Sequence, residues 1–158
     1  MIAARKLLPL AALAGLALSP SARAEDAAVV KRLEALGIKI NTDGDGDYRV
    51  VYNYASEGRS QLVYIAGSTI EIRGNSVRKI FSPAALLSGG KVTGEQALAL
   101  LGDSGRSAYG GWEIRSDVLY YAIEVPEPLT ATALKSAMDV CAELADNKEL
   151  ELTGADEF

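Results

Sequence analysis

The chain has 158 residues, with 16 Lys and Arg, 21 Asp and Glu, one Cys and no His. Without His there is no Ser-His-Asp or Cys-His catalysis and no imidazole metal site. A single Cys excludes an intramolecular disulfide and a zinc site built from several thiolates. The hydrophobic fraction of 49% and the charged fraction of 23% are typical of a globular protein.

Residues 1–24 have the pattern of a secretory signal peptide. Arg5 and Lys6 form a basic start, residues 7–18 are almost entirely apolar, and Ala22-Arg23-Ala24 matches a small-residue cleavage site. The apolar run is shorter than the about 20 residues that a membrane-spanning helix needs. We therefore expect cleavage after Ala24 and a mature protein that is soluble in the periplasm or outside the cell.

Residues 25–158 are expected to form one acidic domain. Removing the three basic residues of the signal peptide leaves 13 Lys and Arg against 21 acids, a net charge of −8. Nucleic acids and anionic membrane surfaces both attract basic patches, so neither is an expected partner. The overall charge favours solubility and either a basic partner or cations.

The first half of this domain is predicted to be one helix followed by strands. The apolar spacing predicts a helix over residues 27–36, and Gly37 is a suitable stop. Tight turns separate segments rich in Val, Ile and Tyr, which are typical of strands. The expected strands are 38–40, 48–54, 61–66, 69–73 and, as a possible fifth, 77–81.

The second half is predicted to be a helix, a hairpin and a long helix. Thr93 and Gln96 have capping-box spacing for a helix that ends near Gly102. Residues 109–115 and 118–125 are expected to form the hairpin. Thr130 is expected to cap a helix to about residue 147, with Leu134, Ala137, Met138, Cys141, Leu144 and Ala145 as its apolar stripe. Residues 155–158 are expected to be a mobile acidic tail.

The order α-β-β-β-(β)-α-β-β-α, with short connections between strands, indicates antiparallel pairing. We therefore predict an α+β fold, an antiparallel β-sheet with helices packed on one face.

Three segments of the chain resemble the YbjN family of bacterial sensory transduction regulators. They are LEALGIKINTDGDGDYRVVYNY at 33–54, GRSQLVYIAG at 58–67 and SDVLYYAIEVPEPLTATALKSAMDVCAEL at 116–144. The resemblance implies a fold like that of type III secretion chaperones, and a non-enzymatic regulator or chaperone-like adaptor that binds a protein or itself as a homodimer. It supplies no catalytic residues. The better-known members are cytoplasmic, whereas this chain begins with a predicted signal peptide.

Tyrosines mark the candidate partner-binding surface. Tyr52 and Tyr54 share one strand face with Tyr48, because side chains two residues apart point the same way. Tyr64 and Tyr120 are expected to join them from neighbouring strands. Tyrosine is enriched at binding surfaces, so these residues are the partner-binding hypothesis if one sheet face lacks a covering helix. The alternative is ordinary half-buried sheet packing.

A loop of alternating acidic residues is the candidate metal site. Asn41, Asp43, Asp45 and Asp47 alternate with residues that include two glycines, and calcium prefers such oxygen ligands. The loop is not an EF-hand, because Tyr52 stands where the bidentate Glu belongs. It is either a weak calcium site, which makes a small exported calcium-binding protein the alternative function, or a turn closed by its own Asp side chains.

Neither the carboxylate pairs nor the cysteine suggests catalysis. Glu124 with Glu127 and Glu149 with Glu151 are expected to be exposed, with nothing to raise their pKa values. Cys141 lies on the apolar stripe of the last predicted helix among acidic neighbours, so it is expected to be a buried, inert thiol. We expect no enzyme and no resident cofactor.

Overall fold

The computed structural model describes residues 27–158, so the predicted signal peptide lies outside the described residues. The fold is α+β, as predicted, with a seven-stranded antiparallel sheet. Within the described part of the chain, no helix is long and apolar enough to cross a membrane. The helices are α1 (Ala27–Ala35), α2 (Gly94–Arg106) and α3 (Ala131–Thr153), with a short 3-10 turn η1 (Leu87–Gly89). The strands are β1 (Asn41–Thr42), β2 (Tyr48–Tyr54), β3 (Arg59–Ile65), β4 (Ile70–Ile72), β5 (Asn75–Leu86), β6 (Gly111–Arg115) and β7 (Val118–Pro126).

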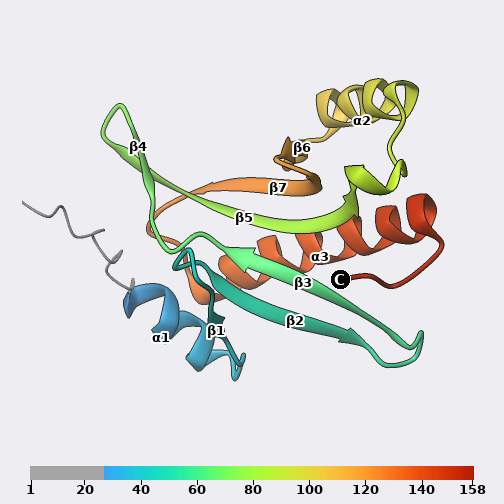
Figure 1. Ribbon diagram of the computed structural model, residues 1–158. Helices are drawn as coiled ribbons and strands as arrows, with labels where there is room; N and C mark the ends of the chain where they lie inside the picture. The colour runs from blue at the N-terminus through green and yellow to red at the C-terminus, as the bar shows by residue number, and fades with distance from the viewer. Residues whose placement is uncertain (1–26) are drawn as a thin grey trace, which may run out of the picture.

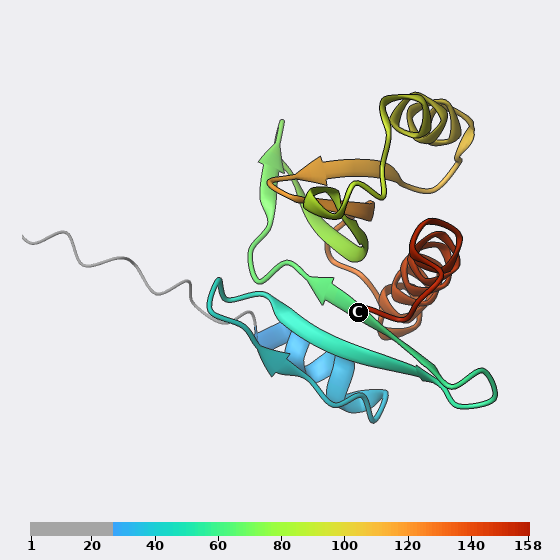
Figure 2. The ribbon, with the colours of Figure 1, turned by 45° about the vertical axis from the view of Figure 1, so that its right-hand side comes forward.

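The sheet runs in the order β1-β2-β3-β5-β7-β6, and β4 pairs with the start of β5 as a projecting hairpin. Helix α3 lies behind the sheet and crosses β3, β5 and β7 (Figure 1). Helix α1 contacts α3 on the same side, and α2 lies beside the edge strand β6 (Figure 2). One face of the sheet is therefore covered by α1 and α3, and the other faces the viewer in Figure 1.

The core forms where α1 and α3 meet the covered face. Val29 and Leu33 of α1, Ile80 of β5 and Met138 of α3 are all fully buried in it. Thr130 caps α3 by accepting a hydrogen bond from the backbone N–H of Ala133, as its position predicts. The predicted apolar stripe is buried except at Leu144, which is 38% exposed, so that assignment was wrong.

Strand β5 is longer than its sequence pattern predicts, because it continues through Ser82 and Pro83. Pro83 cannot donate a ladder hydrogen bond, and the pairing of β5 with β7 shifts between Pro83 and Ala85. Beyond Phe81 no backbone pairing with β3 remains, and side chains fill the gap instead. The buried Gln61 amide donates to Ser82 Oγ (2.8 Å) and to the Pro83 carbonyl (2.6 Å), and Ser82 donates to the Leu62 carbonyl.

Helix α2 also continues past its predicted end at Gly102. The predicted capping box of Thr93 and Gln96 is confirmed. The additional turn is held by a tertiary contact, because Ser104 Oγ accepts a hydrogen bond from the Trp112 backbone N–H at 2.7 Å. Leu100 is buried against the same strand region. Packing against β6 therefore outweighs the low helix propensity of glycine.

The C-terminal segment is docked, contrary to the prediction of a mobile tail. Helix α3 runs to Thr153 and ends at Gly154, whose φ of 69° is readily adopted only by glycine. The Asp156 carboxylate accepts a hydrogen bond from the Ser60 N–H at 3.2 Å. Glu149 accepts from the N–H groups of Glu157 and Phe158. Backbone donors, which the residue pattern does not reveal, hold these acidic residues in place.

Candidate functional site

The predicted tyrosine surface divides between the two faces of the sheet. Tyr52 and Tyr54 lie on the covered face with Tyr48, which is fully buried. Tyr64 pairs with Arg49 rather than with an even-numbered β2 residue, so Tyr64 lies on the opposite face. Tyr120 lies with Tyr64, because both flank Phe81. The prediction of one shared face was wrong, since the β2–β3 register decides which side each tyrosine occupies.

Tyr52 and Tyr54 line a cleft between the β2–β3 hairpin and α3. The cleft has a volume of about 350 Å³, and Glu57, Arg59, Asp139 and Asp146 are among its other lining residues. The Tyr52 hydroxyl donates to Asp139 Oδ1 at 2.8 Å. Burial, with neighbouring carboxylates, raises the pKa of Tyr54 to about 12 and that of Tyr52 further. Both phenols are therefore neutral and act here in packing and hydrogen bonding.

Tyr64 and Tyr120 belong to a row of side chains on the face opposite α3, which we call the open face. No helix of residues 27–158 covers this face, and all three helices lie behind it or at its edge (Figures 1 and 2). The Tyr64 ring stacks on Phe81 with centroids 5.2 Å apart, and Tyr120 meets Phe81 edge-on at 5.5 Å. Such ring pairs contribute beyond the area they bury.

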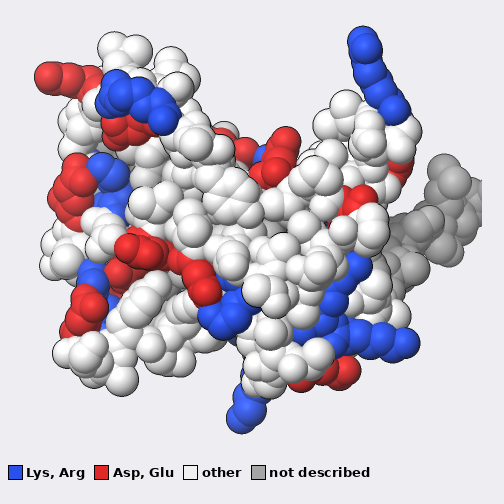
Figure 3. Space-filling model, turned by 180° about the vertical axis from the view of Figure 1, so that it is seen from behind, with Lys and Arg blue, Asp and Glu red and all other residues white. Residues whose placement is uncertain are grey.

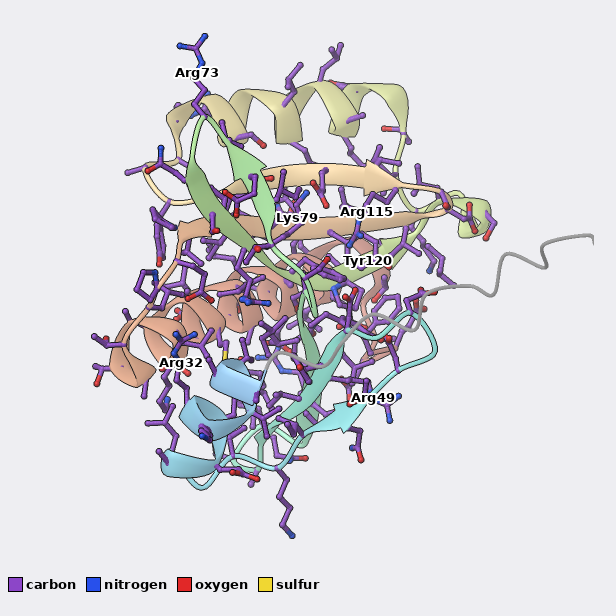
Figure 4. The ribbon with its side chains drawn as sticks, turned by 90° about the vertical axis from the view of Figure 1, so that its left-hand side faces the viewer. Arg32, Arg49, Arg73, Lys79, Arg115 and Tyr120 are labelled. Atoms are coloured by element: carbon purple, nitrogen blue, oxygen red, sulfur yellow. The ribbon has the colours of Figure 1, made fainter. Side chains whose placement is uncertain are left out.

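Two arginines contact this aromatic row. The Arg115 guanidinium lies 4.0 Å from the Phe81 ring centroid and 4.6 Å from that of Tyr120. Arg49 hydrogen-bonds the Tyr64 hydroxyl. Tyr120, Arg115 and Lys79 gather on one side of the sheet, and Arg49 lies on that side too (Figure 4). We call Arg49, Tyr64, Phe81, Tyr120 and Arg115 the aromatic stripe.

The aromatic stripe draws one residue from each of five neighbouring strands, β2, β3, β5, β7 and β6. Phe81 is only 5% exposed, although no helix covers it, because its neighbours in the stripe pack around its ring. Burial raises the pKa of Tyr64 and of Tyr120, and Arg49 and Arg115 partly offset this. Both phenols therefore remain neutral hydrogen-bonding groups. The sequence pattern does not reveal Arg49, Phe81 and Arg115 as members of this surface, since only strand order brings them together.

The surface around α3 differs in its distribution of charge. Viewed from behind, acidic and basic side chains are interspersed over the surface that contains α3 (Figure 3). Several of them form ion pairs along one helix, such as Lys135 with Asp139 and Lys148 with Glu151. Exposed pairs of this kind contribute little to stability and mark a solvated surface.

The acidic loop uses its carboxylates to hold its own backbone. Asp43 Oδ1 accepts from the N–H groups of Asp45 (2.9 Å) and Asp47 (3.0 Å), and Asp47 Oδ1 accepts from the Gly67 N–H at 2.9 Å. Asn41 belongs to β1 and pairs with Arg49. In residues 27–158, no group of three or more Cys, Asp or Glu side chains is placed to hold a metal ion. The loop has the contacts of Asx turns.

Asp43→Ala is expected to lower the free energy of unfolding by about 1–2 kcal/mol, because two backbone donors lose their acceptor. Asp45→Ala is the matched control, because it removes an exposed carboxylate for which no such contact is seen. It should change the free energy of unfolding by less than about 0.5 kcal/mol. Urea unfolding in EDTA and in about 2 mM calcium, a concentration suited to a weak extracellular site, measures both. We expect each variant to lose the same free energy of unfolding with EDTA as with calcium. A calcium-dependent stabilisation that Asp43→Ala abolishes would instead support the calcium-binding alternative.

Of the carboxylates expected to be exposed, Glu149 is buried and Glu127 is partly buried. The Glu127 side chain is 10% exposed and pairs with Arg78 and Arg32. Glu149 is 1% exposed and holds the C-terminal segment. Glu124 is exposed as expected. The prediction failed for Glu127 because its two arginine partners come from distant parts of the chain. It failed for Glu149 because the residues after α3 turn back and donate backbone N–H groups to it.

Glu149 is expected to make stability depend on pH. Burial raises its pKa from 4.5 to about 7, so between these values the folded protein holds a proton that the unfolded chain releases. Stability from this group is therefore present below about pH 4.5 and is lost as the pH rises towards 7. Glu149→Gln should raise the melting temperature at pH 8 and change it little at pH 5. Glu151→Gln, an exposed neighbour on α3, should show no such difference, and equal shifts for both variants would contradict the assignment.

Cys141 is fully buried, as predicted. Its Sγ donates to the Tyr121 carbonyl at 3.2 Å. Burial raises the pKa of the thiol far above neutrality, so the nucleophilic thiolate does not form at physiological pH. Cys141 is therefore a core residue of α3.

Comparison of the chain with protein-family models and with curated proteins finds no match. The geometry of the open face is therefore the basis on which its function is inferred.

Proposed function

We propose that this chain is an exported, non-enzymatic binding module that holds a partner protein on the open face of its sheet. The aromatic stripe is the observation that supports this. Aromatic and arginine side chains dominate the energetics of protein interfaces, and here both occur together on a face that no described helix covers.

The projecting β4–β5 hairpin extends the same face. Ile70 pairs with Val77, which shares its strand side with Lys79 and Phe81, and Ile70 and Ile72 are 58% and 50% exposed. Exposed isoleucines beside an aromatic stripe give a partner further apolar surface to bury. The resemblance to the YbjN family agrees with this role, since it implies a regulator or chaperone-like adaptor without catalytic residues.

The experiment is site-specific photo-crosslinking in cells that export the protein. Benzoylphenylalanine placed at position 120 should give one dominant adduct, because Tyr120 belongs to the aromatic stripe of the open face. The matched control places the same residue at position 98, where Leu98 is 71% exposed on α2. The same set of adducts from both positions would contradict the proposal.

Point variants then test the stripe itself. Tyr120→Ala should reduce recovery of the partner by at least about tenfold, in the range of an interface hot spot. Tyr109→Ala, which removes an exposed tyrosine from outside the stripe, should leave recovery unchanged. Melting curves must show that both variants fold. Equal recovery with both folded variants would exclude the stripe as the binding surface.

A further inference from the structure

The open face has a local charge opposite to that of the whole protein. The chain carries a formal charge of −5, yet the described strands place three cations, Arg49, Lys79 and Arg115, on this face. The acids on the same strand faces are Glu113 and Glu124. A partner in contact with this face meets this local arrangement and not the average charge of the molecule.

The two acids of the open face are already engaged. Glu113 accepts from Lys79 Nζ at 2.7 Å and pairs with Arg115 Nε at 3.0 Å, and Glu124 lies 3.5 Å from Lys79. Lys79 is therefore neutralised within the face. The charge of Asp43, in the neighbouring loop, contributes to the raised pKa of Tyr64. The Asp43 carboxylate already accepts hydrogen bonds from two backbone N–H groups.

The guanidinium groups of the stripe keep capacity for a carboxylate. Arg115 uses Nε for Glu113, contacts two aromatic rings through its guanidinium group, and has a side chain that is 44% exposed. Arg49 is exposed and bonds the neutral Tyr64 hydroxyl, with no ion pair to a described carboxylate. Arginine held against aromatic rings loses little further freedom when it forms a paired hydrogen bond to a carboxylate.

We propose that the aromatic stripe binds an extended segment of the partner in which two acidic residues flank an apolar one. This inference rests on the proposed function and names the chemistry of the bound segment. Alternate side chains of an extended chain point to the same side, so the pattern Glu-x-Phe-x-Glu presents carboxylate, ring and carboxylate to one surface. The stripe offers one guanidinium group beside Tyr64, from Arg49, and a second over Phe81 and Tyr120, from Arg115.

The test measures binding of three labelled nine-residue peptides to the purified protein by fluorescence anisotropy. One peptide is Gly-Ser-Glu-Val-Phe-Val-Glu-Ser-Gly, and in the other two both glutamates are replaced by glutamine or by lysine. The glutamate peptide should bind at least about tenfold more tightly than the glutamine peptide, as expected for two charge-assisted contacts. The lysine peptide should bind most weakly, and the preference should shrink as salt is raised.

Variants assign the preference to the stripe. The double variant Arg49→Gln/Arg115→Gln should bind the glutamate and glutamine peptides equally. Arg106→Gln, which removes an exposed arginine on α2, should keep the tenfold preference. Preserved preference in the double variant would overturn the inference.

The outcomes distinguish a failure of this inference from a failure of the proposed function on which it rests. If the glutamine peptide binds as tightly as the glutamate peptide and Tyr120→Ala abolishes both, the open face is a binding surface but the acidic preference is wrong. If no peptide binds while crosslinking at position 120 yields a partner, the acidic extended segment is wrong and the proposed function stands. If position 120 also yields no adduct, both fail.

Discussion

Glu127→Gln is expected to lower the free energy of unfolding by about 3 kcal/mol, because it removes the charge of a carboxylate that pairs with the buried Arg78 and with Arg32. The Arg78 side chain is 1% exposed, and its Nε lies 2.6 Å from Glu127 Oε1. The second carboxylate oxygen accepts from Arg32 Nη1 of α1 at 3.0 Å and from the Leu129 N–H at 2.8 Å. One carboxylate therefore joins α1, β5 and the segment that leads into α3.

Equilibrium urea unfolding followed by circular dichroism measures this cost. Glu124→Gln is the matched control, since Glu124 lies near the end of β7, three residues before Glu127, is 54% exposed and is 3.5 Å from Lys79. That exposed pair should contribute less than about 1 kcal/mol. Similar small losses in both variants would show that Arg78 reaches solvent or another partner when Glu127 is neutral.

Gly67→Ala is expected to destabilise the fold by about 3 kcal/mol, at the upper end of the usual cost of overpacking. A Cβ atom at Gly67 would lie 1.9 Å from the carbonyl oxygen of Gly46. This contact is to backbone, so no side chain can rotate away. The acidic loop must move, and the hydrogen bond from the Gly67 N–H to Asp47 is then lost.

Gly102→Ala is the control, and its expected change in stability has the opposite sign. Gly102 lies inside α2, where an added methyl group meets only the end of the Arg106 side chain at 3.5 Å. Alanine favours the helix over glycine by about 0.5–1 kcal/mol, so this variant should be more stable than the wild type. Thermal melting compares the two. A Gly67→Ala protein as stable as the wild type would mean that the loop does not rest against residue 67.

Local structure could be predicted from neighbouring residues in most of the chain. The strand at Tyr48–Tyr54, the capping box at Thr93 and the Thr130 cap are all confirmed, because each depends on residues within a few positions of one another. The longer extent of α2 and β5 was not predicted. Both elements continue through Gly or Pro because a second element, β6 or β7, pairs or packs with them.

Only some residues of the candidate site could be predicted from the sequence. The sequence pointed to Tyr64 and Tyr120 as members of a binding surface, but it grouped them with Tyr52 and Tyr54. A shift of one residue in strand register moves a side chain to the other face, and no single strand contains the information on its register. Phe81, Arg49 and Arg115 join the stripe for the same reason.

By itself the sequence determined the fold class, the apolar stripe that buries Cys141 and the absence of imidazole chemistry, since composition and short-range periodicity decide these properties. Tertiary structure alone decided that no described helix covers the face opposite α3, that aromatic rings from three strands meet there, and that Glu127 pairs with Arg32 and Arg78. Each of these features depends on which distant segments pair, and pairing is set by the packing of the whole sheet against α1 and α3.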